Sequence, residues 1–311
     1  MTKFSIVFAG QGSQSVGMMS GFSTMPVVQR TFEEASAILN IDLWNMIVDG
    51  PAELQNLTVN TQPLMLTAGV ATYRAWLVQG GVAPSHFAGH SLGEFTALVA
   101  AGALAFSDAL PLVRFRAEAM QEAVPAGVGA IAALLGLDAD HVRAVCADAA
   151  QGEVVEAVNL NSPGQIVIAG HKAAVARAMA LATERGAKRA LLLPMSVPSH
   201  CALMKPAAEK LASYLQNVPF TVPQIPVIQN ADVKSFATVA EIKQALVEQL
   251  FRPVRWIETI QVLSAGGTTT VIECVPGKIL TGLNKRIVST LDCIAVSDAV
   301  SLAAGIDSTR K

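Results

Sequence analysis

The sequence predicts an α/β protein in which a smaller domain is inserted into a larger domain built on a parallel sheet. Three observations lead to this fold class. Strand and helix patterns alternate in the first part of the chain. A β-α-β-β-α-β order then interrupts them, and the alternation resumes afterwards. We therefore expect a large domain formed by residues 1–126 and 195–311 and a small domain formed by residues 127–194.

Composition indicates a large buried fraction and excludes several functional classes. Of the 311 residues, 52% are hydrophobic and only 15% are charged, which suits one large domain or two smaller ones. No apolar run is long enough to span a membrane, and the first one, FSIVFA, is interrupted too early for a signal peptide. The net charge of −2, without basic runs interleaved with aromatics, argues against nucleic-acid binding. The four cysteines show no metal-ligand spacing, so we expect reduced thiols, no metal and a cytoplasmic location.

The first part of the chain begins with a buried strand, FSIVFA, which runs directly into the glycine-rich turn GQGSQ. Amphipathic helical patterns follow, and the short apolar segment HFAG reads as a second strand. The expected strands are 4–9 and 86–89, and the expected helices are 26–39, 62–77, 92–102 and 107–123.

The middle of the chain follows the split βαβ order of a ferredoxin-like unit, and the turn NSPG joins its second and third strands. Its expected strands are 128–137, 153–160, 165–170 and 188–194, and its expected helices are 138–150 and 173–186. The chain then returns to alternating elements, with a helix after His200, strands at 226–230 and 268–274, and helices at 239–250 and 278–288. The polar last residues, 306–311, are expected to fray.

The motif GHSLGEF contains Gly-x-Ser-x-Gly with Ser91 at its centre. An apolar strand precedes Ser91 and a helix follows it, which is the context of the nucleophile elbow in α/β-hydrolase-like domains. Glycines give such a turn room, and the helix N-terminus favours negative charge beside the serine. Ser91 is therefore a candidate nucleophile, although a serine that only caps this helix would fit the same pattern.

The candidate base is His200, in a turn just after the small domain ends, where loops at a domain junction tend to carry catalytic residues. The other histidines lie on the strand before Ser91 or on the small domain's helices: His86, His90, His141 and His171. No acid is evident as the orienting partner of the base. The aspartates between Ser91 and His200 that we considered, Asp138, Asp140 and Asp148, all lie in the inserted domain, which argues against an ordinary hydrolase triad.

The glycine-rich turn after the first strand lacks the spacing of a dinucleotide-binding loop, because Ser15 stands where the third glycine would be. Such a turn can instead aim a backbone N–H group at the active site. A tetrahedral intermediate needs two such donors, and we expect them to be the backbone N–H groups of Gln11 and Leu92.

Taken together, the motifs resemble the malonyl-CoA:acyl-carrier-protein transacylases of bacterial fatty-acid synthesis. The matching stretches lie in order along almost the whole chain: FAGQGSQSVGM, TQPLMLTAGVATYRAW, GHSLGEFTALVAAGAL, MQEAVPAG, VNLNSPGQIVIAGH, SVPSHCALMKPAAEKL and PGKILTGLNKRI. The resemblance implies Ser91 as nucleophile and His200 as base, with the backbone carbonyl of Gln249 orienting His200 in place of an acid. It also implies that Arg116 binds the free carboxylate of the malonyl group and that Met120 lines the pocket.

The same resemblance implies a ping-pong transfer from malonyl-CoA to the phosphopantetheine thiol of acyl carrier protein, without metal or other cofactor, by a monomeric enzyme. Because carrier proteins are usually acidic, a local basic patch is expected, with Lys188, Arg189, Lys285 and Arg286 as candidates. Val275 departs from the family pattern, which usually has glycine there. Two alternatives remain open at this point: a serine thioesterase or hydrolase acting on acyl-CoA, and a non-catalytic acyl-binding protein.

Overall fold

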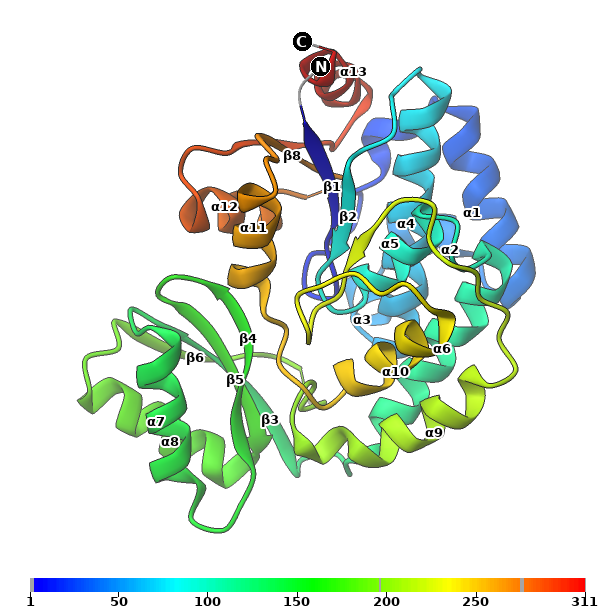
Figure 1. The fold of residues 1–311 in the computed structure, drawn as a ribbon. Helices are drawn as coiled ribbons and strands as arrows, with labels where there is room; N and C mark the ends of the chain where they lie inside the picture. The colour runs from blue at the N-terminus through cyan, green and yellow to red at the C-terminus, as the bar shows by residue number, and fades with distance from the viewer. Residues whose placement is uncertain (1–2, 196, 275–276, 311) are drawn as a thin grey trace.

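The computed structural model describes residues 3–195, 197–274 and 277–310. It is a mixed α/β protein with one parallel sheet and a separate antiparallel sheet, as Figure 1 shows. Within the described residues, no helix is both long enough and apolar enough to cross a membrane.

The large sheet has five strands in the order β7-β2-β1-β8-β9, and every neighbouring pair is parallel. All five residues of the central strand β1 are buried, which explains its uninterrupted apolar sequence, since strands of a parallel sheet are covered on both faces. The strands are β1 (Phe4–Phe8), β2 (His86–Gly89), β7 (Val227–Ile228), β8 (Thr270–Glu273) and β9 (Asp292–Ala295).

Helices from both ends of the chain surround this sheet. In Figure 1 the blue and cyan helices lie on one side of β1, and the orange α11 and α12 lie on the other. The helices of this part of the chain are α1 (Pro26–Leu39), α2 (Leu43–Val48), α3 (Ala52–Gln55), α4 (Thr58–Val78), α5 (Gly93–Ala100), α6 (Phe106–Ala123), α9 (Lys205–Leu215), α10 (Val239–Gln249), α11 (Trp256–Ala265), α12 (Ile279–Ile287) and α13 (Ala299–Thr309), with 3-10 turns at Ser20–Phe22 and Ala202–Met204.

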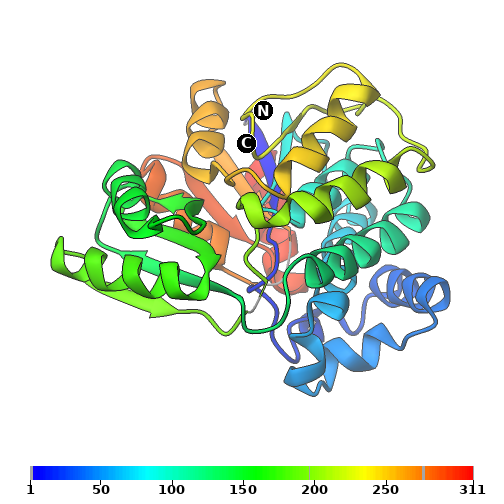
Figure 2. The same cartoon turned by 90° about the horizontal axis from the view of Figure 1, so that it is seen from below.

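The second sheet is antiparallel, with the strand order β4-β5-β3-β6, and it has a hydrophobic core of its own. Figure 2 shows this green part of the chain as a separate body beside the large domain. Its elements follow one another in the expected β-α-β-β-α-β order: β3 (Gly129–Leu135), α7 (Ala139–Ala150), β4 (Val155–Ser162), β5 (Gln165–His171), α8 (Lys172–Glu184) and β6 (Arg189–Leu192).

Backbone hydrogen bonds join the small sheet to the large domain. The N–H of Leu160, on β4, donates to the carbonyl of Val254, whose own N–H donates to the carbonyl of Val158, at 2.9 Å each. Arg286, on α12, donates to the Gln165 side chain at 2.8 Å. These contacts fix β4 against the segment before α11 and so hold the small sheet against the large domain.

The C-terminal part of the chain differs from the sequence prediction. Fraying of 306–311 is wrong for Ile306–Thr309, because these residues form the last turn of α13. This helix starts with a capping box between Asp298 and Ser301 and buries Leu302 and Ile306 on one face. The sequence reading also left out α11 and β9.

Candidate active site

Ser91 lies on a sharp turn between β2 and α5. Its φ is 52°, in the left-handed region that a non-glycine residue rarely adopts. The flanking glycines make this turn possible because neighbouring backbone atoms leave no room for a side chain at either position. A Cβ on Gly89 would lie 1.9 Å from the backbone of Gly93, and a Cβ on Gly93 would lie 2.1 Å from the carbonyl oxygen of Phe8. The Gly-x-Ser-x-Gly pattern therefore follows from how closely three backbone segments pack here.

His200, in the segment that follows the small domain, meets the Ser91 side chain. The Ser91 Oγ and the His200 Nε2 are 2.8 Å apart, and the His200 Nδ1 is 2.7 Å from the carbonyl oxygen of Gln249. Because a carbonyl can only accept, Nδ1 carries the proton and Nε2 is left to accept from the serine hydroxyl. Burial, together with the nearby Arg116 charge, lowers the pKa of His200 to about 3. The imidazole is therefore neutral near pH 7, as a general base must be.

Arg116 brings a positive charge to the same point from α6. Its side chain is buried, and its Nη2 lies 3.4 Å from the Ser91 Oγ. Nη1 donates to the side-chain oxygen of Gln62, and Nη2 donates to that of Gln249, both at 2.9 Å. Burial lowers the pKa of Arg116 to about 10, so the guanidinium remains charged near pH 7. In the described residues, the side-chain acceptors that hold the Arg116 guanidinium are the neutral amides of Gln62 and Gln249. Its positive charge therefore remains available for an anion beside Ser91.

The active-site cavity is about 460 Å³ in volume and is bordered by both domains. Gln11, Leu92 and Met120 line it together with Ser91 and His200. Leu92 is the N-cap residue of α5, so the first N–H groups of that helix lie next to Ser91. The small domain contributes lining residues from three of its strands and from the segment after β6: Ile131, Asn159, Asn161, Val167, Leu193 and Pro194. Met195, the first residue after the small domain, also lines the cavity.

Sequence reasoning missed Asn230, which holds the serine turn closed. Its side-chain oxygen accepts from the Ser91 N–H at 2.7 Å, and its Nδ2 donates to the Gly89 carbonyl at 2.6 Å. Its backbone N–H donates to the buried Glu94 at 2.7 Å. One signal was available, because Asn230 comes two residues after β7, at the carboxyl end of a parallel strand where sites form.

Two further buried polar residues near the serine were also missed. Burial raises the pKa of Glu94 to about 8, and within the described residues its Oε1 has no hydrogen-bond partner. Gln62 is a buried amide on α4. Each of them stands in an otherwise apolar helical stretch, Glu94 as an acid and Gln62 as an amide. Such groups are rarely buried without a partner, so this position was an available signal of a polar site.

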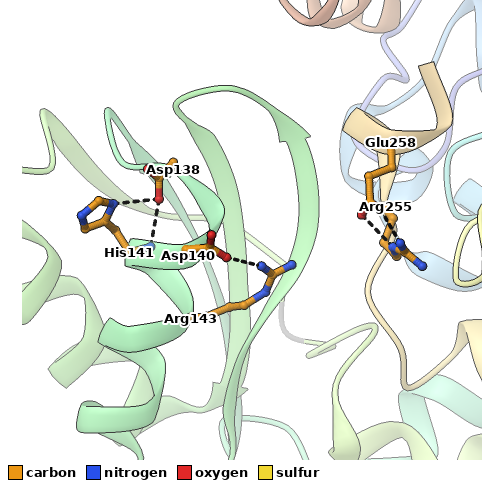
Figure 3. A network of polar contacts seen from close by, with 6 residues as sticks. All are labelled: Asp138, Asp140, His141, Arg143, Arg255 and Glu258. Carbon is orange, nitrogen blue, oxygen red and sulfur yellow. Dashed lines mark hydrogen bonds and ion pairs between the residues drawn. The ribbon is translucent and has the colours of Figure 1, made fainter. Parts of the chain in front are cut away.

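The other histidines contribute no base to Ser91. His90 Nε2 pairs with the Asn161 Oδ1 at 2.8 Å, across the boundary between the domains. The His141 side chain is 71% exposed and pairs with Asp138. Figure 3 shows this pair at the start of α7. His171 Nδ1 accepts from the Val154 backbone at 2.9 Å, and His86 lies near Ser85.

Among the described residues, no group of three or more His, Cys, Asp or Glu side chains is arranged to hold a metal ion. Val275, where the sequence departs from the pattern of the resembled family, lies outside the described residues.

Comparison with known proteins gives a consistent result. A family model described as the acyl transferase domain matches residues 5–302. The malonyl CoA-acyl carrier protein transacylase of Escherichia coli strain K12 is 53% identical over 308 residues, which cover 99% of this chain and 100% of that protein. The corresponding protein of Bacillus subtilis strain 168 is 45% identical over 313 residues, covering 100% of this chain and 98% of that protein.

Two solved structures show the same likeness in three dimensions. The acyl-carrier-protein S-malonyltransferase of Burkholderia pseudomallei 1710b superimposes with a TM-score of 0.97 at 57% identity, covering 98% of this chain and 100% of that one. A malonyl-transacylase in complex with its type II polyketide synthase acyl-carrier protein also has a TM-score of 0.97, at 51% identity, with 99% and 100% of the two chains covered.

Proposed function

This chain belongs to the acyl transferase domain family, and we propose that it transfers the malonyl group from malonyl-CoA to the phosphopantetheine thiol of acyl carrier protein. The observation that carries the substrate assignment is the Arg116 guanidinium, which is buried, charged and 3.4 Å from the Ser91 Oγ. A malonyl thioester bound at Ser91 has a free carboxylate that an acetyl thioester lacks. A buried guanidinium can bind that carboxylate through two parallel hydrogen bonds.

The first half of the proposed reaction acylates the enzyme. The Ser91 oxygen attacks the thioester carbonyl carbon while its proton passes to the His200 Nε2, 2.8 Å away. The negative oxygen of the tetrahedral intermediate is stabilised by the backbone N–H groups of Gln11 and Leu92. The carbon–sulfur bond then breaks, CoA leaves as the thiol with the proton from His200, and malonyl-serine remains.

The second half passes the malonyl group to the carrier. The phosphopantetheine thiol loses its proton to His200 and attacks the malonyl-serine carbonyl. Collapse of the second tetrahedral intermediate releases the Ser91 oxygen, which takes the proton back from His200. Throughout both halves, the Gln249 carbonyl holds the proton-bearing Nδ1 of His200, a role that an acid plays in hydrolase triads. No cofactor enters this scheme, because the chain's own groups move every proton.

We assign residues 1–126 and 195–311 to an α/β-hydrolase-like catalytic domain and 127–194 to a ferredoxin-like subdomain. The strand–turn–helix around Ser91 and the strand order of the small sheet support these assignments. The enzyme is proposed to act in the cytoplasm as a monomer, in fatty-acid synthesis.

Four basic residues, two on the small domain and two on α12, are proposed to bind the acidic carrier protein. Arg189, on β6, is exposed, and so are Lys285 and Arg286, on α12. The last two also donate to acceptors within the chain, Leu291 and Gln165, which orients their side chains but does not bury them. Lys188 precedes β6 and completes this candidate patch.

The test is an intact-mass measurement of the protein with malonyl-CoA and acetyl-CoA in competition, with and without carrier protein. We expect one malonyl group per chain, absent in Ser91→Ala, retained in the exposed control Ser213→Ala, and removed by holo carrier protein. Rapid release of free malonate without an acceptor would identify a thioesterase instead. No covalent adduct under any condition would identify an acyl-binding protein and refute the transfer mechanism.

A further inference from the structure

We propose that the side chains of Gln62 and Gln249 are positioning residues that hold the Arg116 guanidinium and thereby set the preference for malonyl over acetyl. This inference rests on the proposed function and concerns the same site. The Gln249 carbonyl already has a role toward His200, so the new role belongs to the amide of its side chain. Gln62 was not among the residues that the sequence indicated.

Three helices bring these groups together in a buried position. Gln62 lies on α4, Arg116 lies on α6, and Gln249 is the last residue of α10. Each of the three residues is about 1% exposed. Arg116 Nη1 donates to the Gln62 Oε1 and Nη2 to the Gln249 Oε1, both at 2.9 Å. The two amides therefore grip the two terminal nitrogens of the guanidinium separately, and its plane cannot turn without breaking one of these bonds.

Each amide is itself fixed at its other end. Gln249 Nε2 donates to the Ser91 carbonyl at 3.0 Å, which turns its oxygen toward Arg116. Gln62 Nε2 lies 3.7 Å from the Met120 sulfur, which likewise leaves its oxygen for Arg116. Gln249 thus links three functional groups: its backbone holds His200, and its side chain holds both the serine turn and the arginine. The Arg116 Nε is buried and has no hydrogen-bond partner in the described part of the chain.

The chemistry of an amide suits this task better than that of a carboxylate. An amide oxygen accepts a hydrogen bond from the guanidinium but leaves its positive charge uncompensated. A carboxylate in the same place would form an ion pair with Arg116 and compete with the carboxylate of the substrate. Two neutral acceptors therefore give the guanidinium a fixed direction while keeping it able to bind an anion next to Ser91.

Four variants test this inference, each assayed with both substrates on the same preparation so that any unfolded fraction cancels in the ratio. Gln62→Met and Gln249→Met keep the side-chain length, and Gln249→Met keeps the carbonyl that holds His200. We expect both to lower the malonyl-to-acetyl ratio of kcat/KM by about tenfold, through a higher KM for malonyl-CoA. Gln249→Met should also slow acetyl transfer, because it loses the bond to Ser91, whereas Gln62→Met should not.

Gln62→Glu separates the orientation of the Arg116 guanidinium from the compensation of its charge. The variant keeps a hydrogen-bond acceptor for Arg116 but adds a negative carboxylate. Its malonyl transfer should fall below that of Gln62→Met, with acetyl transfer little changed. A purely structural role for Gln62 predicts the opposite, namely rescue by the glutamate. The control Gln244→Met, on the exposed side of α10, should keep the wild-type ratio.

An unchanged malonyl-to-acetyl ratio in both methionine variants would overturn the inference while leaving the proposed function intact. Failure of the wild-type protein to transfer malonyl at all would overturn the proposed function itself, and this inference with it. The two failures are distinguishable because the first appears only in the variants and the second appears in the wild type.

Discussion

Ser91 and His200 lie 109 residues apart in the chain, yet their side chains meet at 2.8 Å and both have left-handed backbone conformations, with φ of 52° and 66°. Such conformations cost about 1–3 kcal/mol each for non-glycine residues and persist only where the surroundings enforce them. Asn230 enforces the first by bonding the Ser91 N–H and the Gly89 carbonyl. The end of α10 enforces the second, because the His200 N–H donates to the Leu250 carbonyl at 2.9 Å.

Replacing Arg116 with alanine should reduce malonyl transfer much more than acetyl transfer. The lost interaction is a buried charge pair with the substrate, worth about 2–5 kcal/mol of barrier on general grounds. The measurement is kcat/KM for malonyl-CoA and acetyl-CoA with the variant and the wild type. Arg114→Ala, two residues away on a more exposed face, is the matched control. Equal losses with both substrates would contradict the assigned role.

The reactivity of Ser91 should persist at lower pH than an ordinary histidine base would allow. A pKa of about 3 keeps His200 neutral well below its usual range, so the acid limb of the rate profile moves down. The charge of Arg116 contributes to that shift, and its removal should raise the pKa of His200 and move the limb to higher pH. Burial, the larger cause, remains in such a variant, so the pKa should still be lowered.

An uncharged serine-reactive fluorophosphonate measures this limb without a titrating substrate. Labelling rates of the wild type and of Arg116→Gln are compared at decreasing pH, with folding monitored by circular dichroism. Coinciding acid limbs in the two proteins would show that Arg116 does not act on His200.

Gly93→Ala should destabilise the protein even though Gly93 lies in a helix, where alanine is normally favoured. The added Cβ would lie 2.1 Å from the Phe8 carbonyl oxygen, so the backbone of α5 or β1 must shift. We expect a loss of about 1–3 kcal/mol in the free energy of unfolding, measured by urea denaturation. Gly282→Ala is the matched control, because nothing lies within 4 Å of its Cβ position on α12, and it should gain about 0.5–1 kcal/mol. Similar stabilities for the two variants would refute the close-packing explanation.

Glu94→Gln should remove part of the pH dependence of stability. The folded-state pKa of Glu94, about 8, is above its ordinary value of 4.5, so the folded protein binds a proton that the unfolded chain releases. Stability from this group is fully present below pH 4.5, decreases as pH rises, and is lost above about pH 8. Glutamine keeps an acceptor for the Asn230 N–H and does not titrate.

Thermal melts between pH 5 and pH 9 compare this slope in the two proteins. The variant should lose less stability over this interval than the wild type does. Parallel stability curves would show that the carboxyl titrates normally or is not coupled to folding.

Local sequence patterns predicted most of the elements and the identity of the central groups. A continuous apolar run identified β1, because a strand of a parallel sheet is buried on both faces. Apolar patterns with the helical period identified α1, because a helix that buries one face repeats its apolar residues with that period. The elbow context indicated Ser91, and elimination among five histidines indicated His200. The helix α13 was missed because its last turn, Ile306–Thr309, has a mostly polar sequence, although Ile306 and Thr309 are buried in the fold.

What the sequence by itself determined was the set of groups that we propose to react, because that set depends on residue type and on short spacings around Ser91. Only the tertiary structure decided how Arg116 is held, since its partners Gln62 and Gln249 lie 54 and 133 residues away along the chain. An amide side chain carries no local signal of what it will bind. Its partner is chosen when three helices pack and every buried donor and acceptor must be satisfied, and that choice belongs to the folded protein.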